Sequence, residues 1–353
     1  MSFNIADCKL ASIKIVFVIL LPDKSALYKF VQIKLDFFIL QFCKLQFFIS
    51  AYMNNVSVIV LSYNTKDITS HCLQKLENAK LYCEKRLGNK IEVIVLDNGS
   101  SDGSSLMVKQ DFPLLRLIES KQNTGFSKGN NMVMRKVKTP YILLLNSDVY
   151  LEEDSLYKAL AYFRVNKNCD VLGVRLNYAT GKLQPSAGFL PNPLNLIFWI
   201  FGLSLLPFMD SGAFHPRGRS FFKKAHQVDW VMGAFFMLKK EVYRKVSGFD
   251  ENIFMHMEEI EWCKRIKNSG YRIWYVPQIE VIHLHGASTN FDLSSSFLNE
   301  LKGIKYYLQK HYGNFYLLVK LFLILGLILR TVAFSLIGKH KRARIYLEGL
   351  SVI

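Results

Sequence analysis

The chain has 353 residues, which is enough for one large domain or two small ones with a substantial core. Its 45 basic and 28 acidic residues leave a formal net charge of +17, which indicates an anionic partner such as nucleic acid, acidic lipid or a phosphorylated substrate. The six cysteines include no CxxC pair and show no spacing typical of a disulfide framework, so reduced thiols in a cytosolic setting are the simpler interpretation.

The first 52 residues differ in composition from the rest of the chain. They are rich in Lys, Phe, Ile and Leu without sustained periodicity, and their apolar stretch at 13–22 is too short to span a bilayer. No small-residue cleavage site follows it, whereas Met53 opens "MNNVSVIVLSYN", which reads as a natural start. We predict that residues 1–52 are an atypical extension, either poorly ordered or the product of an over-extended reading frame.

From residue 56 the chain alternates between short apolar runs and helical periodicity. "VSVIVLSYN" (56–64) is typical of a buried parallel strand. Residues 67–86 place apolar side chains on one helical face: Ile68, Cys72, Leu76, Ala79 and Cys83. Further strands are expected in "IEVIVLDNGSSDGS", at 114–119 and in "PYILLLNSDVYL", with a helix after the turn at 123–131. This alternation predicts a doubly wound α/β sheet with Tyr63, Asp97 and Asp148 at the carboxyl ends of strands, where such sheets bind ligands.

Two aspartates at these strand ends are candidates for ligand binding. Asp97 can accept hydrogen bonds from a nucleobase or ribose, and the alternative is an Asx turn that caps the next helix. Asp148 ends a strand that is apolar on both faces, where an unpaired carboxylate would be costly to bury. One interpretation is a site for Mg²⁺ or Mn²⁺ shared with substrate phosphates, and the other is an N-cap for the segment beginning at Glu152.

The turn "NTGFSKGNN" (123–131) precedes a helix and can bring backbone amides close to a phosphate. It matches neither a Walker loop nor a GxGxxG fingerprint, so a plain loop explains it equally well.

An acidic run at Glu258, Glu259 and Glu261 has two interpretations. Such runs are commonly solvated faces, but here the carboxylates alternate with Phe254, Met257, Ile260 and Trp262. This predicts a partly buried helix start at which one glutamate has a raised pKa and acts as a base. His283 and His285 follow at the end of the next expected strand and improve the case for a site only modestly.

Two apolar segments concern membranes. Residues 194–209 form either a buried helix or loop, or a segment that dips into a membrane. Residues 315–338 are long enough to span a bilayer, but Lys320 and Arg330 interrupt them, which slightly favours a helix lying in the membrane plane. The basic tail "KHKRAR" (339–344) favours contact with an anionic cytoplasmic leaflet.

Taken in order, these segments resemble the family 2 glycosyltransferases, especially the rhamnosyltransferase-like group of bacterial surface polysaccharide biosynthesis. The matching stretches are "VSVIVLSYN", "VIVLDNGSSDGS", "NTGFSKGNN", "ILLLNSDV", "VDWVMGAFFMLKKEVYRKVSGFDENIFMHMEEIEWCKRIKNSGYRIWYVP" and "VIHLHGAS", within residues 56 to 290. The resemblance implies a GT-A fold, a nucleotide-diphosphate sugar donor, a divalent cation and inversion at the anomeric carbon. The expected organisation is an extension at 1–52, a catalytic domain at 53–296 and a helical membrane-associated segment at 297–353.

The resemblance also implies roles for individual residues. The nucleotide-sugar positions are Tyr63, Asp97, Asn123, Gly125 and Asn130, and the position where acceptor and donor sugars meet is matched by Trp230 and Gly233. The metal motif has Asn146 at its first acidic position, which leaves Asp148 as its main anionic ligand, with His283 as a further metal or diphosphate contact. The expected base is Glu259, with Glu258 as the alternative because the pair replaces a Glu-Asp.

We therefore expect a metal-dependent, inverting transfer of a single sugar, from a dTDP-rhamnose-like or UDP-sugar donor to a glycan or lipid-linked acceptor. A QxxRW signature and the multiple spans of processive synthases are absent, which favours single transfer. The expected partners are the donor, the acceptor and an anionic membrane at the cytoplasmic face, and not nucleic acid. The alternatives are an inactive sugar- or lipid-binding protein of the same fold, or a nucleotidyltransferase, although "SYNTKD" replaces the glycine-rich phosphate loop that the latter requires.

Overall fold

The computed structural model describes residues 56–353 apart from 89, 204–213, 217 and 287–292. The predicted extension 1–52 and the last two residues of "VIHLHGAS" lie outside the described residues. The strands are β1 Val56–Ser62, β2 Ile91–Asp97, β3 Arg116–Glu119, β4 Tyr141–Asn146, β5 Val149–Leu151, β6 Val171–Asn177, β7 Leu183–Gln184, β8 Ala187–Gly188, β9 His226–Val228, β10 Trp230–Val231, β11 Phe235–Lys239 and β12 Ile273–His283. The helices are α3 Lys66–Leu87, α4 Ser104–Asp111, α5 Gly125–Met134, α6 Ser155–Val165, α7 Pro193–Ile200, α8 Lys240–Val246, α9 Glu258–Asn268, α10 Leu293–Tyr312, α11 Phe315–Leu336 and α12 His340–Gly349.

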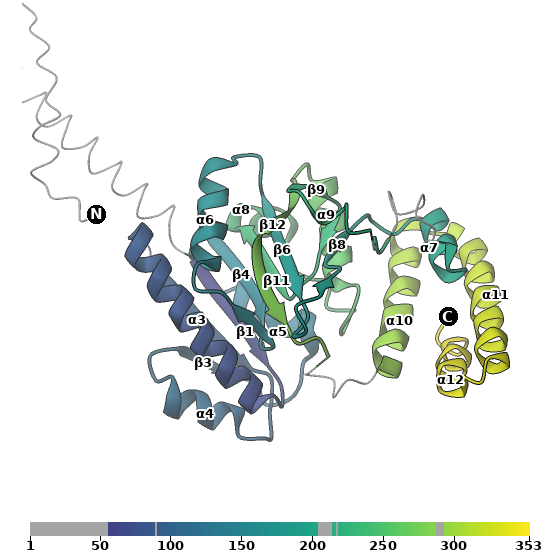
Figure 1. The fold of residues 1–353 in the computed structure, drawn as a ribbon, viewed down its shortest axis with the longest axis horizontal. Coiled ribbons are helices and arrows are strands. Elements are labelled where there is room, and N and C mark those ends of the chain that lie inside the picture. Colours follow the sequence, from purple (N-terminus) through teal and green to yellow (C-terminus); the bar gives the residue numbers. More distant parts are fainter. Residues whose placement is uncertain (1–55, 89, 204–213, 217, 287–292) are drawn as a thin grey trace, which may run out of the picture.

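One mixed sheet organises the molecule, and its main path runs in the order β3-β2-β1-β4-β11-β6-β12-β5 (Figure 1). From β3 to β4 every neighbouring pair is parallel, as the sequence predicts for its first half. Beyond β4, β11 runs antiparallel to both of its neighbours, and β12 is parallel to β6 but antiparallel to β5. The predicted α/β fold is confirmed, with its antiparallel pairs confined to the second half of the sheet.

Side chains of β1 alternate between two cores because successive residues of a strand point to opposite faces. Val58 and Val60 join one core with Cys72 and Leu76 of α3, whereas Ile59 joins the opposite core, which contains residues of α5, α9, α10 and α11. The predicted apolar face of the helix at 67–86 is therefore buried against the sheet. The four described cysteines are free and buried, which agrees with the expected absence of a disulfide framework among them.

The prediction of a single strand in "PYILLLNSDVYL" is wrong in one respect. The structure divides it into β4, which ends at Asn146, and β5, which begins at Val149, so Asp148 lies in the turn between them. The chain changes partner here, because β4 pairs with β1 and β11 while β5 pairs with β12. The alternative role of Asp148 as an N-cap is excluded, since α6 begins at Ser155 with Asp154 at its N-cap.

The carboxyl-terminal helices α10, α11 and α12 pack together with α7 beside the sheet (Figure 1). Four residues of α10 are fully buried and belong to the core that contains α9: Leu301, Ile304, Tyr307 and Leu308. The boundary expected between 296 and 297 falls inside α10, whose buried face belongs to the same core as the catalytic domain.

A buried charge on α9 holds α10 in place. Glu261 is fully buried, and its carboxylate pairs with Arg265 at 2.9 Å and with Lys310 of α10 at 2.8 Å. Burial alone would raise the pKa of Glu261, but His311, Arg265 and Lys310 outweigh it and hold the pKa below its usual value. The ionised carboxylate therefore links the two helices.

Replacing Glu261 with Ala should lower the free energy of unfolding by about 3 kcal/mol, because the partly buried cations would lose their counter-charge. Glu348→Ala is the matched control, since its pair with Arg344 is largely exposed and should contribute no more than about 0.5 kcal/mol. Chemical unfolding followed by tryptophan fluorescence measures both values, and equal losses in the two variants would contradict this role of Glu261.

Candidate active site

The carboxyl ends of β1, β2 and β4 bring the first group of predicted residues together. Ser62 lies in register with Asp97, and Leu61 lies in register with Asn146. Tyr63, Asp97 and the turn that holds Asp148 therefore follow neighbouring strand ends at one edge of the sheet. Buried hydroxyl groups connect this edge, because Thr65 Oγ1 lies 3.2 Å from Ser62 Oγ and 3.3 Å from Ser147 Oγ.

Asp97 presents a free acceptor at this edge. Its side chain is buried, and Oδ2 accepts a hydrogen bond from the Ser100 backbone N–H at 3.2 Å, which is the expected Asx turn. Oδ1 is buried and has no hydrogen-bond partner among the described residues. Asp97 does not cap the next helix, because α4 has Gly103 at its N-cap. An orphaned buried acceptor is costly unless a ligand donates to it.

Asn98 is a residue that the sequence analysis missed. Its Oδ1 accepts from the backbone N–H of Thr124 at 3.1 Å, and its Nδ2 donates to Asn123 Oδ1 at 3.0 Å. Asn123 Oδ1 also accepts from the Gly125 N–H, so the predicted nucleotide contact Asn123 is engaged in holding the turn before α5. The only hint in the sequence is that Asn98 follows Asp97 in a polar loop.

Gly125 is required at the start of α5 for two reasons. Its φ is +79°, which L side chains rarely adopt, and a Cβ would lie 2.6 Å from Phe254. Asn130, the last predicted nucleotide contact, is buried, and its amide donates to the Phe126 carbonyl of its own helix at 3.0 Å. The structure thus gives Asn130 a contact within α5 and does not place it among the groups at the strand ends.

Asp148 and His283 are brought face to face. Asp148 Oδ1 lies 3.3 Å from His283 Nε2, and both side chains are almost completely buried. The backbone N–H of Leu284 donates to the Asp148 carbonyl at 3.0 Å, and His283 Nδ1 lies 3.0 Å from Gln184 Oε1. Because an amide oxygen can only accept, Nδ1 carries the proton of this hydrogen bond, and Nε2 is the ring nitrogen that faces the carboxylate.

Two acceptors that face each other in a buried turn require a proton or a cation between them. Asp148 and His283 therefore fit a divalent cation, with Gln184 as the group that orients the imidazole. No cluster of three or more His, Cys, Asp or Glu side chains able to hold a metal occurs among the described residues. The protein supplies two ligands at this position, so a bound diphosphate and water would complete the coordination.

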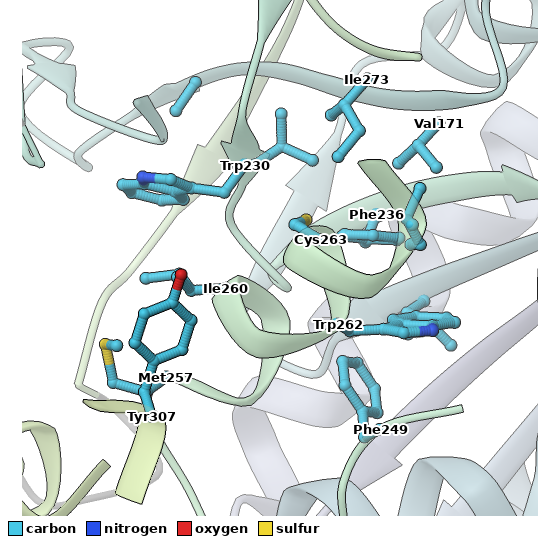
Figure 2. Close-up of a cluster of buried hydrophobic side chains, with 14 of the residues drawn as sticks. Val171, Trp230, Phe236, Phe249, Met257, Ile260, Trp262, Cys263, Ile273 and Tyr307 are labelled. Atoms are coloured by element: carbon cyan, nitrogen blue, oxygen red, sulfur yellow. The ribbon is translucent and has the colours of Figure 1, made fainter. Parts of the chain in front are cut away.

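Glu258 and Glu259 begin α9, as the sequence predicts. The turn before them is strained, because His256 and Met257 have φ values of +67° and +73°. Trp262 anchors the helix: its ring stacks on Phe236 with centroids 5.1 Å apart, and Figure 2 shows both rings inside the buried cluster. The start of α9 is thus held rigidly against the sheet.

The two glutamates are in different environments. Burial raises the pKa of Glu258 well above its usual value, and the neighbouring charge of Glu259 raises it further. Burial also raises the pKa of Glu259, but backbone hydrogen bonds, one from Gly233, and the nearby His215 oppose the shift. Glu259 is only half-buried, whereas Glu258 is 5% exposed. Glu259 is therefore the more readily ionised and the more accessible of the two.

Gly233 connects Glu259 to the turn that holds Asp148. It directly precedes Ala234, whose carbonyl accepts from the Asn146 N–H at 3.0 Å at the end of β4. Trp230, predicted to lie where the sugars meet, is instead buried at 2% exposure, and its indole N–H donates to the carbonyls of Phe189 and Phe214. Figure 2 shows Trp230 among the buried hydrophobic side chains of the core that also contains Ile260 and Trp262.

This open α/β sheet, with an orphaned aspartate, a carboxylate–imidazole pair and a pair of glutamates near its carboxyl edge, has the GT-A fold. The glycosyl transferase family 2 model matches residues 57–246, more than half of the chain. The chain therefore belongs to glycosyl transferase family 2, and its relatives place it in the rhamnosyltransferase-like group.

Two curated relatives illustrate this similarity. N-acetylglucosaminyl-diphospho-decaprenol L-rhamnosyltransferase of Mycobacterium tuberculosis is 25% identical over 237 residues, which cover 63% of this chain and 76% of the relative. Rhamnosyltransferase WbbL of Escherichia coli K12 is 24% identical over 273 residues, which cover 72% of this chain and 93% of the relative. Among solved structures, the chain is similar to mannosyltransferase PcManGT from Pyrobaculum calidifontis, in complex with GDP-Man and Mn²⁺. The match has a TM-score of 0.50 and 14% identity, and it covers 84% of this chain and 83% of that chain. This similarity shows a shared fold.

Replacing Glu259 with Gln should lower turnover by about two to four orders of magnitude and leave donor affinity unchanged, because only the proton acceptor is lost. Glu258→Gln is the matched control and should lower turnover by a smaller factor. The pKa of Glu259 is raised, so its carboxyl group is protonated and inactive at low pH. The wild-type rate should therefore rise with pH at values above the usual glutamate pKa of about 4.3. A larger loss in Glu258→Gln would transfer the role to that residue.

Proposed function

We propose that this protein transfers a single sugar, with inversion, from a nucleotide-diphosphate sugar to a glycan or lipid-linked acceptor in cell-surface polysaccharide biosynthesis. The observation that carries the proposal is the placement near one sheet edge of the Asp148–His283 pair and of three acceptors without a partner among the described residues: Asp97 Oδ1 and the Oε2 atoms of Glu258 and Glu259. Such a set suits a ligand that brings hydroxyl donors, a diphosphate and a cation into the site.

The donor would occupy the edge from β2 to β5. Asp97 accepts hydrogen bonds from the nucleoside, beside Tyr63 and the turn that Asn98 holds at Thr124 and Gly125. Asp148 and His283 hold Mg²⁺ or Mn²⁺, which when bound neutralises charge on the departing diphosphate. Three of the relatives are named as rhamnosyltransferases, which supports a dTDP-rhamnose-like donor. A UDP-sugar is the alternative donor.

Glu259 would act on the acceptor. Its carboxylate takes the proton from the attacking hydroxyl, whose oxygen forms the new bond to the anomeric carbon as the nucleotide departs from the opposite side. The Gly233 N–H orients the carboxylate, and the core around Trp262 fixes the helix that carries it. A direct displacement of this kind inverts the anomeric configuration.

The carboxyl-terminal helices support placement at the cytoplasmic face of the plasma membrane. α11 is long and apolar enough to cross a bilayer by length and composition, yet one side of it packs on protein. Gly326 lies against Ile200 of α7, and the Arg330 guanidinium donates to the carbonyls of Trp199 and Ile200. The other side exposes a row of large apolar side chains: Leu317, Leu318, Leu321, Leu325, Ile328, Leu329 and Val332.

α12 favours an in-plane orientation over a span. It packs beside α11 and carries exposed Lys341, Arg342 and Arg344, which a spanning α11 would place at hydrocarbon depth. With α11 lying in the interface, its apolar row enters the lipid and these cations face acidic headgroups. A lipid-linked acceptor would then be presented at the surface that holds the enzyme.

Replacing Asp148 with Asn should abolish transfer and remove the dependence of donor binding on Mn²⁺, because the substitution keeps the shape and loses the anionic ligand. Transfer and donor affinity are measured across a Mn²⁺ titration. Asp154→Asn is the control, since it removes the same charge from the exposed start of α6. Near-normal transfer by Asp148→Asn in Mn²⁺ would disprove the metal assignment.

Replacing Leu321 and Leu325 together with Asp should reduce partitioning onto anionic vesicles by more than about tenfold, because each buried leucine contributes about 1.5–3 kcal/mol. The control replaces Leu114 and Val165, which are also exposed but lie in the catalytic domain, with Asp. Co-sedimentation at low and high salt provides the measurement. Equal partitioning of both double variants and the wild type would show that α11 does not contact lipid.

A further inference from the structure

A pair of polar side chains beside Glu259 takes no part in the reaction described above. Glu300, on α10, places Oε1 3.0 Å from His215 Nε2. The two side chains remain 26% and 31% exposed, so the pair is open to solvent, unlike the buried charge at Glu261. Both lie within electrostatic reach of Glu259: His215 lowers the pKa of that carboxyl and Glu300 raises it, after the larger effect of burial.

His215 is held by aromatic rings and not by its partner alone. Its ring centroid lies 3.9 Å from that of Phe214 and 5.4 Å from that of Trp230, with the Trp230 ring nearly perpendicular. The Trp230 indole N–H donates to the Phe214 carbonyl at 3.2 Å, which fixes the backbone next to His215. This packing gives the buried Trp230 a role in the site that needs no direct sugar contact.

Glu300 reaches the site because α10 approaches α9 unusually closely. A Cβ on Gly303 would lie 2.6 Å from Met257 Cβ and 2.9 Å from the His256 carbonyl, so glycine is needed at this contact. Glu300 precedes Gly303 by three residues and therefore lies on the same face of α10, toward the strained turn that carries Glu258 and Glu259. The buried contacts of Leu301 and Ile304 fix the helix in this rotation.

We propose that Glu300 and His215 form an acceptor subsite that hydrogen-bonds hydroxyl groups of the acceptor sugar and holds the attacking hydroxyl at Glu259. The inference rests on the proposed sugar transfer. The hydrogen bond between them engages Glu300 Oε1 and His215 Nε2, so Glu300 Oε2 and His215 Nδ1 are the positions offered to a ligand. Neighbouring sugar hydroxyls both donate and accept, and this pair offers both functions on a rigid support.

The subsite makes α10 part of the active site. Asp97, Asp148 and His283 belong to the sheet edge and serve the donor, whereas Glu300 comes from the helices that carry the exposed apolar row of α11. An acceptor sugar bound to a lipid at that surface would meet Glu300 and His215 before it reaches Glu259. The arrangement thus assigns donor and acceptor to different parts of the chain.

Steady-state kinetics of Glu300→Gln and His215→Asn test the proposal, with donor and acceptor varied separately. Each variant should raise the acceptor KM by about ten- to a hundredfold, the effect of losing a hydrogen bond to a charged or polar partner. Donor KM should stay within about twofold of wild type. Glu348→Gln, which removes a carboxylate from α12, should change neither KM.

Several outcomes would overturn the subsite. An unchanged acceptor KM in either folded variant refutes the subsite. A decrease confined to kcat, with a displaced pH profile, also refutes it, because it would mean that the pair acts on the charge of Glu259. If circular dichroism shows that one variant does not fold, the acceptor KM of the other variant tests the subsite. Wild-type enzyme that transfers no sugar from any nucleotide donor would refute the proposed function itself, whereas active wild type with indifferent variants refutes the subsite alone.

Discussion

The structure depends on a concentration of buried negative charge near the sheet edge where β1, β2 and β4 end. Asp97, Asp148 and Glu258 are buried and Glu259 is half-buried, and three of these four carboxyl groups present an oxygen with no partner among the described residues. Burying carboxylates in this way is costly unless a cation, a proton or a hydrogen-bond donor compensates them. A ligand that carries a cation would offset this cost, which is the physical basis of the proposed site.

The rest of the molecule keeps these groups in position. The pleat of β1 separates two cores, so that α3 supports one face of the sheet while α5 and α9 support the other. On the second face, Trp262 fixes α9, and the ionised Glu261 links α9 to Lys310 of α10. Because α10 packs with α11 and α12, the helices proposed to meet the membrane belong to the same core as α9.

Short-range patterns in the sequence predict the helices and strands well, but they predict less well which tertiary contacts these elements make. The apolar run at 56–62, the helical face that includes Cys72 and Leu76, and the helix start at Glu258 all follow from periodicity, and the structure has each of them. The break at Ser147–Asp148 was missed because it depends on a change of pairing partner, from β11 to β12, that no local pattern encodes. Asn98, His215 and Glu300 were missed for the same reason, since each contacts residues far away in the sequence, and Trp230 is buried where a surface contact was expected.

The central claim is that the Asp148–His283 turn binds a divalent cation together with a nucleoside diphosphate. Electron paramagnetic resonance of Mn²⁺ tests it directly, with wild-type protein titrated in the presence and absence of UDP or dTDP. We predict that the nucleotide and the protein together immobilise one Mn²⁺ per chain, beyond what either does alone, because two protein ligands are insufficient without the diphosphate. A spectrum in which the protein adds nothing to the Mn²⁺–nucleotide signal would contradict it.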